Sequence, residues 1–275
     1  MKPLISIYIP TKNRPDLLKR ALESLLAQTF KSFEVIVCSD GFDIETEKIA
    51  LSFNKKMNVS YVFNKGPSGA PATRNTAIKM CKGTFITGLD DDDVFHKDRL
   101  EYFYSNWNDS YAFLATRGRR LKSRRSLFLW LKSIFKYQKY VTFDDLLKYN
   151  SVGNQVFTLT ERLIDEQFDV ELPALQDWEL WLRLLKKYGN GKILRKETQS
   201  LDVNHGGQRV TSYERRMKGL MLVQNKHDIP VQKVRDLVLS WKIEFGQSLN
   251  IEDGVYLIKN FKIKLLYLWI LAYVR

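Results

Sequence analysis

The sequence predicts an α/β protein in which helices flank a mostly parallel, Rossmann-like sheet. Through roughly the first hundred of its 275 residues, apolar runs of strand length alternate with longer amphipathic stretches. Hydrophobic residues make up 44% of the chain, enough to bury a core of one large or two small domains. Reactive side chains directly follow the strand-like runs, and open α/β sheets bind ligands beyond the carboxyl ends of their strands.

Hydrophobic periodicity defines the elements of this first part. Residues 4–9 favour a strand, and residues 14–28 favour a helix because Leu18, Leu22 and Leu25 fall on one helical face. Further strands are predicted at 33–38, 59–63 and 84–89, with helices at 44–53 and 72–80. The resulting order, βαβαβαβ, is typical of parallel strands joined by crossover helices.

After residue 93 the alternation is less regular. The pattern predicts helices at 97–107, 143–149 and 175–188, and strands at 111–115 and 151–159. No internal repeat or linker rich in Gly, Pro or Ser divides the chain. Cys38 and Cys81 offer neither a metal spacing nor a disulfide framework, and the N-terminus shows no signal-peptide pattern. We therefore expect a reducing compartment.

The net charge of +13 is confined to two segments. Residues 117–139 hold nine Lys and Arg and no acid, and residues 255–275 hold four and no acid. These segments account for the whole excess, so the rest of the chain is neutral overall. Basic patches of this kind bind polyanions, which leaves nucleic acid, an anionic membrane or a phosphorylated substrate as partners.

Four consecutive carboxylates, Asp90 to Asp93, follow the predicted strand at 84–89. Like charges this close repel one another unless a cation offsets them. Mg²⁺ or Mn²⁺ takes a few carboxylate oxygens and leaves coordination positions for substrate phosphates. A solvated acidic turn is the alternative, which the position at a strand end disfavours.

Five sequence blocks resemble the inverting nucleotide-sugar glycosyltransferases of family 2, which have the GT-A fold. The blocks are ISIYIPTKNR (5–14), ALESLLAQTFKSFEVIVCSDG (21–41), GAPATRNTAI (69–78), ITGLDDDDVFHKDRL (86–100) and QDWELWLRL (176–184). GNQVF at 153–157 and NHGGQ at 204–208 are most similar to enzymes that assemble colanic acid and related bacterial surface polysaccharides. The resemblance implies a metal-dependent hexosyltransferase that uses Mn²⁺ or Mg²⁺.

The resemblance also implies roles for individual residues. Asp40 would accept a hydrogen bond from the uracil ring, and Arg74 would face the diphosphate, where a guanidinium pairs with phosphate oxygens. Asp92 would bind the metal that bridges both phosphates, and His205 would assist it. The expected donor-binding residues are Pro10, Thr11, Asn13, Arg14, Asp40, Arg74, Asp90 and Asp91.

The chain departs from the family pattern beside the donor. Lys12 stands where an aromatic residue commonly follows the Pro-Thr pair, so the chain has no ring at that position to stack on the base. Ser39-Asp40 replaces the usual paired acids, and Gln176 replaces the Glu that commonly precedes the residue at position 177.

Asp177 is the expected catalytic base, because QDWELW matches the acid-Asp motif of the family. It opens the predicted helix at 175–188, where backbone amides and the helix dipole favour a carboxylate. We therefore expect a low pKa and an ionised side chain at pH 7. The alternative role is a helix N-cap, which Asp often fills. Trp178 and Trp181 could stack on sugars or belong to the core.

The implied reaction is inverting transfer from a UDP-sugar to a lipid-diphosphate-linked oligosaccharide in exopolysaccharide, O-antigen or capsule assembly. Residues 1–115 would bind the nucleotide sugar, and 116–250 would bind the acceptor and carry the base. Two alternatives remain open. A sugar-nucleotide pyrophosphorylase is disfavoured because PTKNR lacks its glycine-rich loop, and a nucleic-acid module would leave the four aspartates unexplained.

The C-terminal segment 251–275 is expected to be a basic, amphipathic, membrane-facing extension. Its apolar run at 265–274 is shorter than the roughly 20 residues that a spanning helix needs. Lysines precede the run and aromatic residues lie within it, a mixture that suits a helix lying at the interface. We therefore expect a cytoplasmic, peripheral protein on the anionic inner face of the bacterial membrane, without nucleic acid as a partner.

Overall fold

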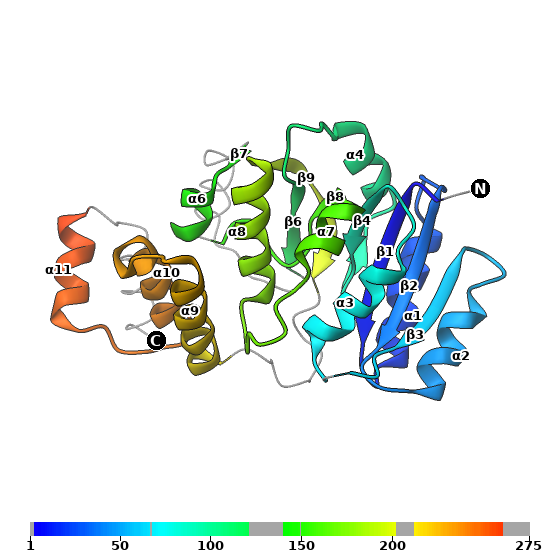
Figure 1. The fold of residues 1–275 in the computed structure, drawn as a ribbon, viewed down its shortest axis with the longest axis horizontal. Helices are drawn as coiled ribbons and strands as arrows, with labels where there is room; N and C mark the ends of the chain where they lie inside the picture. The colour runs from blue at the N-terminus through cyan, green and yellow to red at the C-terminus, as the bar shows by residue number, and fades with distance from the viewer. Residues whose placement is uncertain (1–2, 67, 121–139, 149, 202–211, 261–275) are drawn as a thin grey trace. The chain divides into compact units, whose positions relative to one another are not determined.

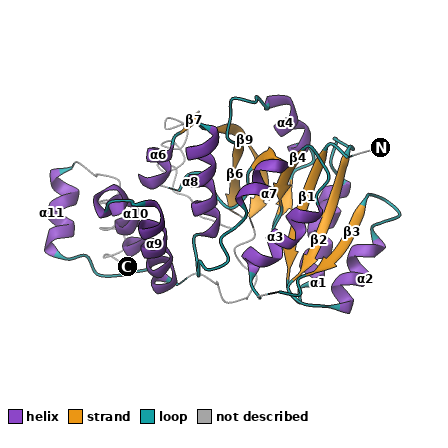
Figure 2. Cartoon of the chain, viewed as in Figure 1, coloured by secondary structure: helices purple, strands orange, loops and turns teal. Residues whose placement is uncertain are grey.

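The computed structural model describes residues 3–66, 68–120, 140–148, 150–201 and 212–260. Within these residues a nine-stranded sheet forms the centre, with strand order β3-β2-β1-β4-β8-β6-β9-β5 and β7 beside β9 (Figures 1 and 2). The strands are β1 (Ile5–Thr11), β2 (Phe33–Ser39), β3 (Val59–Phe63), β4 (Phe85–Gly88), β5 (Val94–Phe95), β6 (Leu114–Arg120), β7 (Tyr140–Val141), β8 (Phe157–Leu159) and β9 (Gly191–Leu201).

Ten helices lie within the described residues. They are α1 (Pro15–Leu26), α2 (Ile44–Ser52), α3 (Ala70–Met80), α4 (Arg99–Asn106), α6 (Phe143–Lys148), α7 (Thr160–Glu166), α8 (Gln176–Tyr188), α9 (Tyr213–His227), α10 (Val231–Glu244) and α11 (Ile251–Lys259). The chain divides into two compact units. The first comprises Met1–Phe143, Val152–Glu171 and Gln176–Gly207, and the second Asp144–Ser151, Leu172–Leu175 and Gln208–Arg275.

The βαβαβαβ prediction for the first part of the chain is confirmed. β1 pairs in parallel with both β2 and β4, and β2 pairs in parallel with β3. The register aligns Thr11 with Ser39, so the carboxyl ends of β1 and β2 lie at the same edge. The strand-end residues singled out in the sequence therefore gather at one edge of the sheet.

Two strand predictions in the second part are corrected. The predicted strand at 151–159 is confined to Phe157–Leu159, antiparallel to β4, and residues 154 and 155 instead turn their side chains toward Asp90. The predicted strand at 111–115 begins only at Leu114 and runs parallel to β9. β9 itself is missed by the sequence pattern, because its charged residues obscure the alternation of its buried ones.

The sheet's two faces hold different elements. Ile5, Ile7 and Ile9 point to one face, where they share a buried apolar cluster with α1 and with Leu100 and Phe103 of α4. Helix α3 packs against β1 and β2. Tyr8, which alternates with the isoleucines, is fully buried on the other face. Strand alternation thus sends one face of β1 to the apolar core and the other toward polar partners.

The second unit is helical in its described residues. A capping box at Asn250 and Asp253 begins α11. Tyr256 of α11 donates to Asp236 of α10, and Lys242 pairs with Asp253 at 2.7 Å. These polar contacts join α10 to α11.

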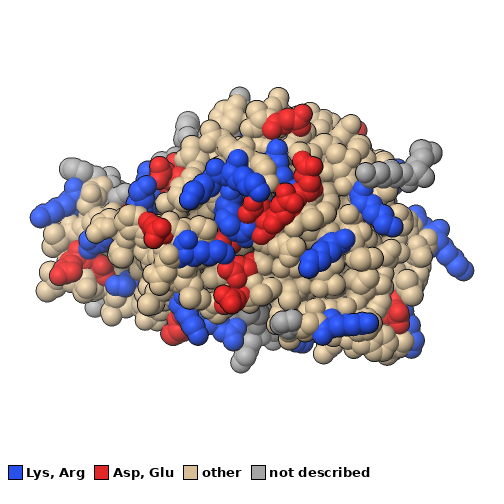
Figure 3. Space-filling model, in the orientation of Figure 1, with Lys and Arg blue, Asp and Glu red and all other residues tan. Residues whose placement is uncertain are grey.

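No described helix combines the length and apolar character needed to cross a bilayer. The basic segment at 121–139, His205 and residues 261–275 lie outside the described residues. The expected membrane-facing surfaces therefore stay predictions, and on the face drawn in Figure 3 the described Lys and Arg side chains lie among Asp and Glu side chains.

Candidate active site

The four aspartates after β4 divide into two kinds of position. Carboxylate oxygens of Asp90, Asp92 and Asp93 lie within 4.8 Å of one another. Asp91 turns away, is fully buried, accepts a 2.6 Å hydrogen bond from Thr11 Oγ1 and pairs with Arg14 at 2.7 Å. Three of the acids therefore converge, and the fourth, Asp91, links the turn to the end of β1 through its hydrogen bond from Thr11.

Asp90 is oriented by side chains from three other segments. Arg74 on α3 pairs with its Oδ1 at 3.0 Å, and Gln155 Nε2 donates to the same oxygen at 3.0 Å. Asn154 Nδ2 donates to Oδ2 at 2.6 Å. Burial lowers the pKa of Arg74, but the charge and hydrogen bond of Asp90, together with Tyr8 and Asp177, outweigh it. The net shift of the pKa is therefore upward and the guanidinium is charged.

Gly88 permits this arrangement at the end of β4. A Cβ at this position would lie 1.8 Å from Gln155 Oε1 and 2.5 Å from the Tyr8 ring. Tyr8 in turn donates its hydroxyl to Gln155 Oε1 at 3.1 Å. Glycine therefore lets Gln155 reach Asp90 across the strand.

A second cluster surrounds Asp40 at the end of β2. Its carboxylate accepts hydrogen bonds from Lys12 Nζ (2.8 Å), Ser68 Oγ (2.7 Å) and the Gly69 backbone N–H (3.1 Å). Partial burial acts to raise the pKa of Asp40, but these donors outweigh it and lower the pKa to about 2. Asp40 is thus held as a carboxylate, and Lys12 supplies a cation beside it.

Asp177 lies in the first turn of α8 and accepts a 2.8 Å hydrogen bond from the Trp178 backbone N–H. The expectation of a low pKa is wrong. Loss of solvent raises the pKa of Asp177 above its ordinary value, and the Trp178 amide and the Arg74 charge only partly oppose this. Burial therefore has a larger effect on the pKa of Asp177 than the N-terminus of the helix has. Asp90 adds to the upward shift, so Asp177, Arg74 and Asp90 lie within electrostatic range of one another.

The acids after β4 suit a divalent cation. Burial and the neighbouring charges of Asp90 and Asp92 raise the pKa of Asp93, and burial raises the pKa of Asp91 to about 6. A cation among Asp90, Asp92 and Asp93 would offset the repulsion between them, which adds to the upward pKa shift that burial causes in Asp93. All three converging side chains offer the oxygen ligands that Mg²⁺ and Mn²⁺ accept. Asp90, Asp92 and Asp93 are therefore the residues that would hold a metal.

The structure places the expected donor-binding residues at the same edge. Pro10 and Thr11 end β1, Asn13 takes a left-handed φ of 51°, and Arg14 contacts Asp91 and Asp92. Asp40 forms a separate cluster with Lys12 and Ser68. Trp178 and Trp181 are fully buried, which assigns them to the core and not to sugar stacking.

Sequence reasoning missed several residues that shape this site. They are Tyr8, Gly88, Asn154, Gln155 and Gln199, the last of which donates to Asp93 at 2.7 Å. Asn154 and Gln155 belong to the GNQVF block at 153–157, so the resemblance marked their position but assigned them no role. Nothing local marked Tyr8 or Gln199.

Fold and site together define a glycosyltransferase of the GT-A type. The family model described as Glycosyl transferase family 2 matches residues 6–160. The chain belongs to this family, so the pyrophosphorylase alternative is set aside.

Two curated relatives illustrate the family. The chain is 35% identical over 235 residues to WcaA of Escherichia coli (strain K12), a protein assigned to colanic acid biosynthesis, with 82% of this chain and 81% of the relative covered. It is 27% identical over 183 residues to the Escherichia coli protein WfgD, covering 67% and 70%. WfgD is a UDP-Glc:α-D-GlcNAc-diphosphoundecaprenol β-1,3-glucosyltransferase. A glycosyltransferase of Rickettsia bellii is longer, and the chain spans 28% of it.

A solved structure supports the fold. TarS of S. aureus in complex with UDP-GlcNAc superposes with a TM-score of 0.66 at 21% identity, covering 98% of this chain and 79% of that chain. At that level of identity the similarity concerns the architecture.

Proposed function

We propose that the chain transfers a hexose from a UDP-sugar to a hydroxyl of a lipid-diphosphate-linked oligosaccharide, with inversion, during assembly of a bacterial surface polysaccharide. One observation carries this proposal: the converging carboxylates that follow β4, an arginine paired with one of them, and a carboxylate able to act as base lie within electrostatic range of one another. The named activities of WfgD and WcaA support the donor, the acceptor and the polysaccharide class.

Asp177 is assigned the role of general base. It would take the proton from the acceptor hydroxyl while that oxygen attacks the anomeric carbon from the face opposite UDP. The bond from this carbon to the phosphate oxygen breaks as the new bond forms, so the configuration inverts. A raised pKa makes the Asp177 carboxylate a stronger base than an exposed aspartate.

Arg74 and the acidic turn are assigned to the leaving group. Arg74 would bind the diphosphate, where its charge stabilises the phosphate oxygen as negative charge develops on it. Asp92, with Asp90 and Asp93, would hold Mn²⁺ or Mg²⁺, which neutralises charge on the diphosphate when bound. Asp90 would also reach the ribose. Asp40 would accept from the uracil N–H, and Pro10, Thr11, Asn13, Arg14 and Asp91 would complete the donor site.

We place the reaction at the inner face of the cytoplasmic membrane. A lipid-linked acceptor presents its sugar close to the bilayer, and the basic segments at 117–139 and 255–275 suit an anionic surface. His205 as a further metal ligand belongs to the proposal as well.

A donor screen tests the function. UDP-glucose, UDP-galactose, their N-acetyl forms and UDP-glucuronate are each incubated with Mn²⁺, the chain and a synthetic GlcNAc-diphosphate lipid, and UDP release and product mass are measured. Acceptor-dependent release from one of these donors is expected. Release from none of the UDP-sugars, with turnover of a GDP-sugar or dTDP-sugar instead, would overturn the assignment of UDP.

A further inference from the structure

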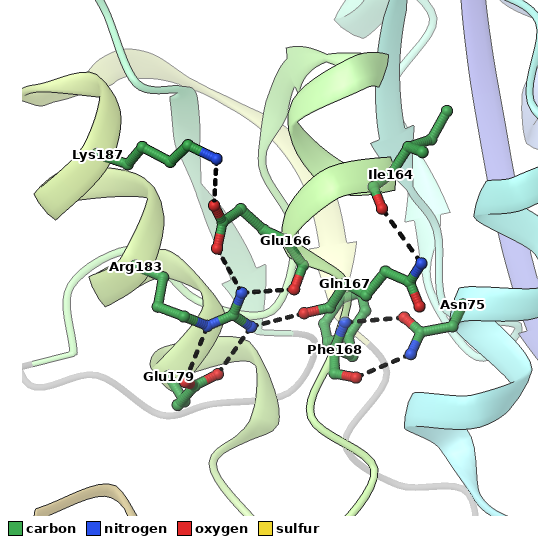
Figure 4. Close-up of polar contacts among 8 residues, drawn as sticks. All are labelled: Asn75, Ile164, Glu166, Gln167, Phe168, Glu179, Arg183 and Lys187. Atoms are coloured by element: carbon green, nitrogen blue, oxygen red, sulfur yellow. Dashed lines mark hydrogen bonds and ion pairs between the residues drawn. The ribbon is translucent and has the colours of Figure 1, made fainter. Parts of the chain in front are cut away.

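A short segment, residues 166–168, lies between α3 and α8 and is hydrogen-bonded to a side chain of each helix (Figure 4). Helix α3 carries Arg74 and helix α8 carries Asp177, the two groups assigned to the leaving group and the base. We call this segment, with the side chains of Asn75 and Arg183 that hold it, the 166–168 brace.

Asn75 forms the end of the brace on α3. Its Nδ2 donates to the Phe168 carbonyl at 2.8 Å, and its Oδ1 accepts from the Phe168 backbone N–H at 2.8 Å. Both bonds are buried, so their loss would leave backbone groups without solvent to replace them. Asn75 directly follows Arg74 on α3. Its two hydrogen bonds therefore hold the backbone of Phe168 close to Arg74.

Arg183 forms the end of the brace on α8. Its guanidinium donates to the carbonyls of Glu166 and Gln167, the latter at 2.6 Å. It also donates two hydrogen bonds of 2.9 Å to the carboxylate of Glu179, which is fully buried. Gln167 between these contacts has a φ of 46°, a left-handed conformation that a non-glycine residue keeps only when its surroundings enforce it.

The Phe168 ring connects the two ends through the core. Arg74 lies over it at 5.3 Å, and Trp181 meets it edge-on at 6.1 Å. Trp181 lies one helical turn after Asp177 and donates its indole N–H to the Gly153 carbonyl at 3.0 Å. A shift of the Phe168 ring would therefore change its contact with Arg74 and its contact with Trp181 on α8 at the same time.

We propose that Asn75 and Arg183 are positioning residues that fix Asp177 relative to Arg74, and so set the geometry of base against donor. The inference rests on the proposed function for its chemical meaning. Neither residue needs to touch the substrate; they act through Phe168 and the backbone of α8.

A double-mutant cycle on the full chain tests the brace. Asn75→Ala, Arg183→Lys and their combination are compared for kcat, for KM and for affinity toward UDP with Mn²⁺, using the donor and acceptor from the screen. Each single variant is expected to lower kcat about 30- to 100-fold, since misplacement of about 1 Å has effects of that order. UDP affinity should stay within about threefold, and the combination should be no slower than the slower single variant.

Lys187→Met is the matched control. Lys187 pairs with Glu166 at 2.8 Å in the same network but leaves the backbone bonds of Arg183 intact, so kcat should stay within about twofold. A lower melting temperature with unchanged kcat in both single variants would make the two residues merely structural. Losses that multiply in the combination would show independent actions. Either result overturns the brace.

Hydrogen exchange of the first turn of α8 separates this inference from the proposed function. Asn75→Ala, made on α3, should speed exchange at amides 180–183, which donate to the carbonyls of the first turn of α8, as much as Arg183→Lys does. Unchanged exchange there would refute the brace, whether or not any donor is turned over. Failure of the unaltered chain to use any UDP-sugar counts against the proposed function instead.

Discussion

Two strand ends of the same sheet hold carboxylates in opposite electrostatic states. At the end of β2, donors from Lys12, Ser68 and the Gly69 amide outweigh burial and lower the pKa of Asp40 to about 2. At the end of β4, burial raises the pKa of Asp91 to about 6, and burial with neighbouring acids raises that of Asp93. The first end is already neutralised by the protein, whereas the second has an excess of negative charge. The electrostatics of the β2 end therefore suit a neutral polar group, and those of the β4 end suit a cation.

The largest expected effect concerns the β4 end. Asp92→Asn removes one of the three converging carboxylates, and transfer should fall at least about 10³-fold, which corresponds to about 4 kcal/mol of transition-state stabilisation. EDTA should have the same effect reversibly. Transfer is measured at saturating donor with Mn²⁺.

Asp109→Asn is the matched control for this substitution. Asp109 is an exposed acid that accepts from the Trp107 indole, away from the converging acids, and its loss should leave transfer unchanged. Equal losses of transfer activity in the Asp92 and Asp109 variants would show that transfer does not depend specifically on the Asp92 carboxylate.

The next effect concerns the base. Asp177→Asn should lower kcat about 10²- to 10⁴-fold, the usual worth of general base catalysis, with UDP affinity unchanged. Because burial raises the pKa of Asp177, the acidic limb of the kcat profile should lie above about pH 4, the ordinary value for aspartate. A comparable loss of UDP binding, measured by calorimetry, would make Asp177 structural.

Stability against pH gives a smaller effect that sharpens the comparison. Asp91 and Asp93 bind protons more tightly folded than unfolded, so they destabilise the metal-free fold as pH rises through their raised pKa values. The metal-free melting temperature should fall between about pH 5 and pH 8 on their account. Saturating Mn²⁺ should raise it more at pH 8 than at pH 5.

The contributions of the two strand ends can be separated in this melt. Asp40 has a lowered pKa, so its contribution is present above about pH 4 and is lost only as pH falls toward 2. A Mn²⁺ effect that is the same at pH 5 and pH 8 would contradict the assignment of the metal to the β4 end.

The smallest expected effect is at the β2 end. Lys12→Met removes the 2.8 Å contact to Asp40, so UDP affinity should fall about three- to tenfold while the dependence on Mn²⁺ is kept. Lys12→Arg retains the charge and should be close to the unaltered chain. UDP affinity that is the same in the Met and Arg variants would remove Lys12 from the donor site.

The two parts of the chain differ in how far the sequence predicts them. Strands β1 to β4 are mostly apolar runs bounded by turns, so their pattern identifies them. Their order places Asp40 and the four aspartates at one edge. β9 carries Lys196, Glu197 and other polar residues between its buried positions, and its pairing with β6 depends on residues far away in the chain.

The site shows the same limit. That Arg74 reaches Asp90 follows from the placement of α3 beside β1, a consequence of the predicted fold. The contacts of Asn154 and Gln155 depend on an irregular stretch before β8 and on the absence of a side chain at Gly88. The raised pKa of Asp177 reflects burial among segments distant in sequence, which the position at a helix start could not reveal.

Calorimetric titration of UDP with and without Mn²⁺ tests the central claim most directly. The unaltered chain should bind UDP more than about tenfold more tightly with Mn²⁺ than without it. Asp92→Asn should lose this dependence, and Asp40→Ala should keep it while binding UDP more weakly in both conditions. UDP binding that is equally tight with and without Mn²⁺ in the unaltered chain would contradict the division of the site into a metal-binding β4 end and a nucleobase-binding β2 end.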